Sequence, residues 1–187
     1  VATGKKYLEL VHRIDKDTSG LLMIAKKRSI LKHLQQALRE KTIQKTYLCL
    51  TQDWLDTDRT LIDQPLLKFT LPNGERRVRV DTKSDDSKPA QTCVRCRQRM
   101  TLHGHKISLI EAQPLTGRTH QIRVHLASLG LPLLGDDKYN RHAADNAALG
   151  VRRLCLHAYQ LDIDGYPTIE ADLPEDMQTL LAHAQNS

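Results

Sequence analysis

Three stretches of the chain repeat hydrophobic residues at the spacing of an amphipathic helix. The first is 29–39, where Ser29 stands at the start as a favoured N-cap residue. The second is 119–129, which Gly130 ends, and the third is 174–184, which begins with a proline as many helices do. We therefore predict helices over these three ranges.

Other stretches have the pattern of β-strands. An apolar run over 21–25 predicts a buried strand, and residues 52–90 are rich in turn residues and predict short strands at best. Alternating or β-rich sequence predicts four further strands, at 45–51, 91–98, 106–112 and 153–163. Because these strands and the helices follow one another without regular alternation, the sequence predicts an α+β fold.

Charge is unevenly distributed along the 187 residues, a length that suits one domain. Residues 1–50 contain eleven Lys and Arg against four Asp and Glu, whereas residues 126–187 contain four against nine. A basic excess in one part of a chain is typical of nucleic-acid binding, although a solubilising surface gives the same pattern. The longest run without Asp, Glu, Lys or Arg, 124–135, is too short to span a bilayer, so we expect no membrane partner.

The four cysteines do not form a zinc-binding pattern. Cys93 and Cys96 make a CxxC inside a predicted strand, where positions three apart face opposite sides. We therefore expect no metal site, and unpaired cysteines favour a cytoplasmic location.

The segment VHRIDKDTSG, residues 11–20, places two carboxylates among cations. Asp15 and Asp17 stand on either side of Lys16, shortly after Arg13, and before a Thr-Ser-Gly turn. A carboxylate beside cations stays ionised and is able to act as a nucleophile, but a turn with solvated charges explains the same residues. In an extended segment the two carboxylates point in opposite directions, so only one of them faces a given cleft.

The segment PLTGRTHQIRVHLASLG, residues 114–130, carries a second group of polar side chains. Arg118 follows Gly117 at the predicted helix start, where a cation opposes the helix dipole unless it serves another partner, such as a carboxylate or a phosphate. The spacing excludes a zincin helix and favours a solvated or RNA-contacting face, formed by His120, Gln121, Arg123 and His125.

Tyr47 lies in the predicted strand that follows the basic first helix. Because it alternates with Leu48, its ring is able to point into a cleft while the strand packs. Ordinary core packing with a satisfied hydroxyl is the alternative for a single strand tyrosine.

Taken together and in order, these motifs resemble a known family. HRIDKDTSG, KTYLCL, LTGRTHQIRVHL with LGLPLLGDDKY, and LCLHAYQL are similar to the catalytic core of pseudouridine synthases of the large ribosomal-subunit type. The resemblance runs from about residue 7 to the LPEDM string at 173–177. It implies an RNA-modifying isomerase for rRNA processing, which converts uridine to pseudouridine in 23S rRNA without cofactor or metal. It also implies a bent, mixed, largely antiparallel sheet with flanking helices and a basic cleft.

The resemblance further implies roles for individual residues. Asp15 matches the essential aspartate of the family, and Asp17 does not. Arg118 is expected to pair with Asp15 at hydrogen-bond distance, roughly 2.7–3.2 Å, and Tyr47 to stack on a flipped-out base. Contacts with RNA are expected from His12, Arg13, His120, Gln121 and Arg123. The basic segment 26–45 is a further phosphate-tracking surface.

Several alternatives stay open at this point. The carboxylate attacks the sugar C1′, attacks C6 of the base, or abstracts a sugar proton. A non-catalytic RNA-binding module of the same fold, or a general α+β interaction domain, would share the architecture. We interpret residues 1–187 as one catalytic domain, a monomer, that lacks the family's Lys-Pro-x-Gly segment before HRxD and its S4-type N-terminal RNA-binding domain.

Overall fold

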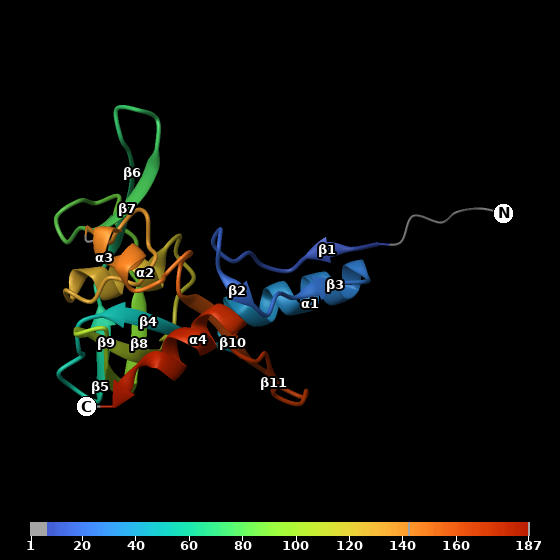
Figure 1. Ribbon diagram of the computed structural model, residues 1–187. Helices are drawn as coiled ribbons and strands as arrows, with labels where there is room; N and C mark the ends of the chain where they lie inside the picture. Colours follow the sequence, from blue (N-terminus) through green and yellow to red (C-terminus); the bar gives the residue numbers. More distant parts are fainter. Residues whose placement is uncertain (1–6, 142, 187) are drawn as a thin grey trace.

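A mixed eight-stranded sheet forms the centre of the molecule in the computed structural model, which describes residues 7–141 and 143–186 (Figure 1). Its strands run in the order β11–β10–β4–β9–β8–β12, with β2 beside β10 and β5 beside β8. Every pairing in it is antiparallel except that of β2 with β10. The strands are β2 (Ser19–Gly20), β4 (Ile43–Gln52), β5 (Arg59–Asp63), β8 (Gln91–Leu102), β9 (His105–Pro114), β10 (Leu156–Ile163), β11 (Ile169–Glu170) and β12 (Gln185–Asn186). The predicted α+β class with a largely antiparallel sheet is therefore confirmed.

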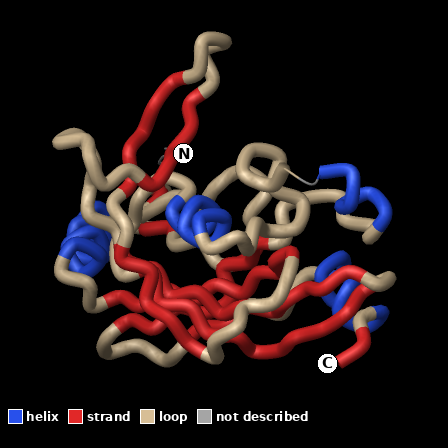
Figure 2. Tube along the Cα trace, turned by 90° about the vertical axis from the view of Figure 1, so that its left-hand side faces the viewer, coloured by secondary structure: helices blue, strands red, loops and turns tan. Residues whose placement is uncertain are grey.

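Two small antiparallel pairs lie outside this sheet. Strand β1 (Glu9–Leu10) pairs with β3 (Ile24–Ala25), and β6 (Leu66–Thr70) pairs with β7 (Arg76–Val80). The β6–β7 hairpin projects from the body of the molecule, as both views show (Figures 1 and 2). The predicted turn-rich region 52–90 thus contains three strands of five residues each.

Four helices accompany the strands. The predicted helices correspond to α1 (Arg28–Arg39), α2 (Gln121–Ser128) and α4 (Glu175–His183), whereas α3 (Ala143–Ala148) was not predicted. Helix α2 contacts β7, β8 and β9, so it links the hairpin to the central sheet.

The central strands are buried on both faces. Adjacent residues of β4, Cys49 and Leu50, belong to different hydrophobic clusters because side chains alternate across a strand. One cluster includes Ile122 and Leu126 of α2, and the other includes Met177 and Leu180 of α4. The site-bearing helix α2 therefore rests on one face of a sheet that α4 supports from the other.

Three element boundaries differ from the prediction. Of the strand predicted at 21–25, only Ile24–Ala25 forms, because the backbone of Leu21 instead donates to the carbonyl of Ala158 at 2.9 Å. Helix α2 begins at Gln121 and not at residue 119, because His120 has a left-handed backbone with φ of 53°. Helix α1 begins at Arg28, so Ser29 lies inside it and Lys27 takes the N-cap position predicted for Ser29.

Candidate active site

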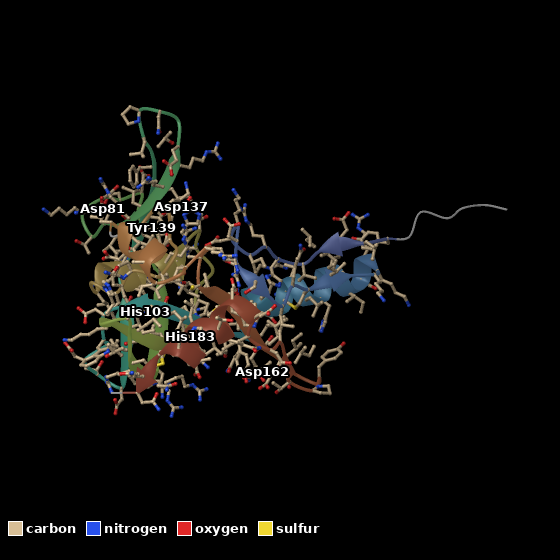
Figure 3. The ribbon with its side chains drawn as sticks, in the orientation of Figure 1. Asp81, His103, Asp137, Tyr139, Asp162 and His183 are labelled. Carbon is tan, nitrogen blue, oxygen red and sulfur yellow. The ribbon has the colours of Figure 1, made fainter. Side chains whose placement is uncertain are left out.

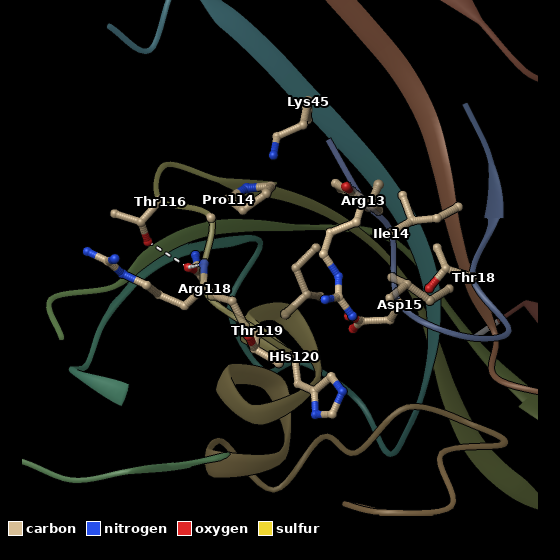
Figure 4. Close-up of a pocket in the computed structure, with 15 residues that line it drawn as sticks. Arg13, Ile14, Asp15, Thr18, Lys45, Pro114, Thr116, Arg118, Thr119 and His120 are labelled. Carbon is tan, nitrogen blue, oxygen red and sulfur yellow. Dashed lines mark hydrogen bonds between the residues drawn. The ribbon is translucent and has the colours of Figure 1, made fainter. Parts of the chain in front are cut away.

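A cavity of about 120 Å³ lies where three segments far apart in sequence meet (Figure 4). The loop 13–18, strand β4 and the turn that leads into α2 provide its walls. Its volume is well below the roughly 300–1,000 Å³ of drug-sized ligand sites, so it suits one small group of a larger ligand. We call it the Asp15 cavity.

Asp15 lies on the loop between β1 and β2 and lines this cavity, whereas Asp17 does not. The backbone N–H of Thr18 donates to the carbonyl of Asp15 at 3.1 Å, which closes a tight turn. Asp17, at the exposed tip of that turn, has a left-handed backbone with φ of 67°. The prediction that only one of the two carboxylates faces the cleft is confirmed.

The cation beside Asp15 is Arg123. A terminal guanidinium nitrogen lies 3.9 Å from Oδ2 of Asp15, and the arginine side chain is only 4% exposed. The same guanidinium donates two hydrogen bonds to Asp136, from Nε at 2.8 Å and from a terminal nitrogen at 2.7 Å. A bidentate geometry of this kind fixes an arginine in place. Asp15 therefore faces a cation whose orientation is set by a different carboxylate.

Burial and the neighbouring charge have opposite effects on the pKa values of Arg123 and Asp136. Burial lowers the pKa of Arg123, but the hydrogen bonds and charge of Asp136 outweigh it and raise the pKa. Burial likewise raises the pKa of Asp136, but its hydrogen bonds with Arg123 hold it below the ordinary value. Both groups are therefore ionised at neutral pH.

The expectation that Arg118 pairs with Asp15 is wrong. Nε of Arg118 donates to the carbonyl of Pro89 at 3.0 Å, and its side chain extends away from Asp15 (Figure 4). Arg118 lies in the turn before α2, whereas Arg123 lies on the buried face of the first turn of the helix. Arg118 still lines the cavity wall, on the side away from the carboxylate.

Tyr47 of β4 lines the same cavity and is 8% exposed. Burial raises the pKa of its hydroxyl to about 12, and the negative charge of Asp15 adds to the shift. The phenol is therefore protonated at neutral pH. The predicted position of Tyr47 in the cleft is confirmed, and its stacking on a base stays a prediction.

The residues predicted to contact RNA differ in their burial and in their contacts. Gln121 and Arg123 are each 4% exposed, and both side chains are hydrogen-bonded within the protein, so their assignment to RNA contact is corrected. His12 is half-buried and accepts a hydrogen bond at Nε2 from the backbone of Met23 at 3.2 Å. Arg13 and His120 line the cavity, and their contacts with RNA stay predictions.

A buried polar chain fixes the turn that precedes α2. The Gln121 amide nitrogen donates to Oγ1 of Thr92 at 2.9 Å, and Thr92 in turn bonds Nδ1 of His125 at 2.8 Å. Nε2 of His125 reaches the carbonyl of Gln64 at 2.9 Å, and Oε1 of Gln121 accepts from Thr116 at 2.6 Å. This chain links α2, β8, the base of the hairpin and the cavity wall.

Sequence reasoning missed Asp136 and Tyr139 as site residues. Both residues belong to the LGLPLLGDDKY string, which contributes to the family resemblance, but neither residue was assigned a role. The Arg123 guanidinium lies 5.2 Å from the centre of the Tyr139 ring, a cation–π distance. Tyr139 and Asp137 lie where the hairpin joins the body of the molecule (Figure 3).

A larger groove of about 630 Å³ opens beside the hairpin. We call it the hairpin groove; its cationic lining residues are Arg77, Arg79, Lys138 and Arg141. Phe69 and Tyr139 add aromatic surface to the same groove. Cations and aromatic rings in one groove are suited to a nucleic-acid strand.

Two further observations bear on the kind of site. Within the described residues no group of three or more His, Cys, Asp or Glu is placed to hold a metal ion. Over the same ranges, no helix is both long and apolar enough to cross a membrane.

Comparisons with known proteins place this site in a family. The sequence profile described as RNA pseudouridylate synthase matches residues 2–128. The ribosomal large subunit pseudouridine synthase C of Pasteurella multocida is 43% identical over 183 residues, which cover 94% of this chain and 54% of that protein. The protein of the same name from Escherichia coli K12 is 40% identical over 191 residues, covering 97% of this chain and 58% of that protein. The chain thus spans about half the length of the curated relatives it matches.

Solved structures agree with these sequence matches. Human RNA pseudouridylate synthase domain containing 1 superposes with a TM-score of 0.82 and 25% identity, covering 97% of this chain and 75% of that structure. Human RNA pseudouridylate synthase domain containing 4 gives a TM-score of 0.75 and 27% identity, covering 94% and 75%. The chain belongs to the RNA pseudouridylate synthase family.

Proposed function

We propose that this chain is the catalytic part of an enzyme that isomerises uridine to pseudouridine in ribosomal RNA of the large subunit. The observation that carries the proposal is the Asp15 cavity, which a carboxylate and a buried phenol from separate segments line, with the fixed guanidinium of Arg123 3.9 Å from that carboxylate. The names of the relatives from Pasteurella multocida and Escherichia coli support the choice of large-subunit rRNA. We assign the substrate to the 23S molecule.

The reaction moves the glycosidic bond from N1 to C5 of the uracil. Since both atoms are shielded in a stacked helix, the target uridine is flipped out and its base enters the cavity. The Asp15 side chain faces the base, and the guanidinium of Arg123 lies 3.9 Å behind it. Tyr47 forms one wall with its ring and keeps its proton at neutral pH.

Surrounding charges suit a polyanionic substrate. Arg13, Lys45 and Arg118 line the cavity itself, and the hairpin groove adds four cations nearby. A surface of this kind neutralises phosphates and gives binding that weakens as salt rises. A binding module without catalysis would gain nothing from a carboxylate in such a cavity, because it repels the phosphates. We also retain the expectation of a cytoplasmic location, which the four free cysteines favour, and the expectation of a monomer.

The test is to incubate the protein with an unmodified 23S rRNA transcript and to map pseudouridine chemically. We expect specific sites to be modified by the wild-type chain and by Asp17→Asn, and none by Asp15→Asn. The asparagine side chain has nearly the same shape but is neither a comparable nucleophile nor a base. Turnover by Asp15→Asn at about a tenth of the wild-type rate, only 1.4 kcal/mol in barrier, would remove Asp15 from the reaction.

A further inference from the structure

His120 holds an unusual backbone position at the edge of the Asp15 cavity. Its φ of 53° lies in the left-handed region, which glycine and asparagine adopt more readily than histidine. Five described non-glycine residues have positive φ, and His120 is the one among them that lines the cavity. Backbone strain at a cavity wall is a common sign of a functional constraint.

A hydrogen-bond relay determines which nitrogen of His120 carries the proton. The backbone N–H of Val78 in β7 donates to the hydroxyl of Tyr139 at 3.1 Å. The hydroxyl has one hydrogen of its own, and the other polar atom bonded to it is Nδ1 of His120 at 2.7 Å. Donation from the tyrosine to Nδ1 gives the hydroxyl hydrogen a partner, and on this basis we assign the hydrogen of the neutral imidazole to Nε2.

The surroundings keep this imidazole neutral and its ring fixed. Burial lowers the pKa of His120; the charge of Asp15 opposes that shift, and the nearby cations Arg123 and Lys138 reinforce it. The ring packs edge-on against Tyr139, with centroids 5.6 Å apart and planes at 70°. Within the described residues the His120 side chain forms its hydrogen bond through Nδ1. Its Nε2–H is therefore left for a ligand in the cavity that Asp15 also lines (Figure 4).

Breaking the bond between C1′ and N1 leaves negative charge on the uracil, shared between N1 and the carbonyl oxygens O2 and O4. A fixed neutral donor at the cavity wall stabilises such charge without adding the repulsion or the proton transfer that a cation would bring. We propose that His120 is a catalytic residue that donates its Nε2–H to a carbonyl oxygen of the flipped uracil. The C1′–N1 bond breaks and a C1′–C5 bond forms, C5 loses its hydrogen and N1 gains one, so the atoms balance. No proton leaves the imidazole, which ends the reaction in its starting state. This inference rests on the proposed isomerisation.

Two substitutions separate a donor role from a backbone role. In His120→Gln the side-chain amide places an N–H near the position of Nε2, but glutamine adopts positive φ reluctantly. In His120→Asn the amide falls near the position of Nδ1, whereas asparagine adopts positive φ readily. We expect single-turnover isomerisation of the 23S transcript to fall by roughly 10- to 100-fold or more in His120→Asn. His120→Gln should stay within about tenfold of wild type.

Thermal unfolding of both variants checks that each one folds. The reverse order, with His120→Asn faster than His120→Gln, would overturn the inference and show that the backbone conformation is what matters. Equal rates for both variants and wild type would also overturn it. If the wild-type chain makes no pseudouridine at all, the proposed function fails instead.

Nitrogen-15 NMR of the histidine rings tests the relay without any activity. In the wild-type chain His120 should show the Nε2–H tautomer, and Tyr139→Phe should convert it to a mixture of both tautomers. An Nδ1–H tautomer in the wild-type chain, or no change in Tyr139→Phe, would contradict the relay. His125, whose ring is bonded to Thr92 and Gln64, serves as the internal control and should not change.

Discussion

Two of the three segments that meet at the Asp15 cavity, the loop carrying Asp15 and helix α2 with its preceding turn, are held in different ways. Residues 11–18 form a partly exposed loop. It is held at its ends, where Val11 bonds Met23 at 3.0 Å and Leu21 bonds Ala158 at 2.9 Å, and at the carbonyl of Asp17, which accepts from Arg153 at 3.1 Å. In α2, by contrast, the functional side chains Gln121, Arg123 and His125 are buried and hydrogen-bonded. The carboxylate that we propose as reactive thus belongs to the segment with fewer buried hydrogen bonds, and its cation to the segment with more.

This division has a chemical advantage. Since Asp136 satisfies Arg123, the guanidinium keeps its place whether or not a substrate is bound. The 3.9 Å separation from Asp15 exceeds hydrogen-bond distance, so the carboxylate keeps its own acceptor capacity for the substrate.

The largest expected effect comes from breaking the rigid segment at Arg123. Arg123→Gln leaves Asp136, which is 1% exposed, without a cation in the interior. Removal of one partner of a buried ion pair costs about 3–5 kcal/mol, so we expect that loss in the free energy of unfolding measured with urea. Arg123→Lys keeps the charge but loses the bidentate geometry and should fall between Arg123→Gln and wild type. A loss below about 1 kcal/mol in Arg123→Gln would contradict the rigid framework.

The same ion pair predicts a dependence of stability on acid. The pKa of Asp136 is lower in the folded state than its unfolded value, about 3.9. Its contribution is therefore fully present above that value and is lost as the pH falls through the lower, folded pKa. Urea titrations of wild type between pH 7 and acid should show this loss, and in Arg123→Gln it should be smaller.

The next effect tests the end of the loop at Gly20. A Cβ placed there would lie 2.1 Å from the carbonyl oxygen of Ala158, on a backbone with φ of +101°. Gly20→Ala should therefore cost about 2–3 kcal/mol and should slow isomerisation, because the loop carrying Asp15 shifts. Gly74→Ala is the matched control: its φ is +83° with no atom within 4 Å, so only backbone strain of about 1 kcal/mol remains. Equal losses in both variants would mean that the contact with Ala158 does not hold the loop.

A smaller effect is expected where the polar chain passes through β8. Thr92→Val keeps the shape but leaves Gln121 and His125 each without one partner, a loss of about 1–3 kcal/mol in unfolding free energy. Thr92→Ser retains the hydroxyl and should recover most of that loss. If valine and serine prove equally stable, the hydrogen bonds contribute little to holding α2.

The smallest effect is expected at Arg118, on the exposed part of the turn. Arg118→Gln removes a surface contact with Pro89, so the free energy of unfolding should change by less than about 0.5 kcal/mol. Its single-turnover rate should remain closer to wild type than that of Arg123→Lys. A collapse of activity in Arg118→Gln alone would return the role of counterion to Arg118.

Local patterns in the sequence sufficed for much of the fold. Alternation placed β4, β8, β9 and β10, and helical periodicity placed α1, α2 and α4, because burial of one face decides these elements. Alternation also separated Asp15 from Asp17. The short strands β1, β2, β11 and β12 could not be found in this way, since two residues carry no periodicity.

The cation beside Asp15 could not be predicted from the local sequence. The sequence favoured Arg118 for this role and assigned Arg123 to RNA contact, whereas the fold buries Arg123 beside Asp15 and turns Arg118 toward Pro89. The left-handed backbone of His120, which delays the helix to Gln121, is not announced by any residue pattern either, because histidine does not require it. Asp136 lies thirteen residues beyond Arg123 across a loop, and only the folded chain shows that they pair.

Because β2 pairs with β10, the end of the loop that carries Asp15 is held only after β10 has been synthesised. Ser19 and His157, which face each other in that pair, are 138 residues apart in the chain. At about 5–20 residues per second, a ribosome needs roughly 7–28 s to make the second strand after the first. Throughout that interval the loop with Asp15 has no strand to hold its end. If Asp15 acts as proposed, a nascent chain surrounded by ribosomal RNA therefore carries this carboxylate several seconds before the strand that holds its loop exists.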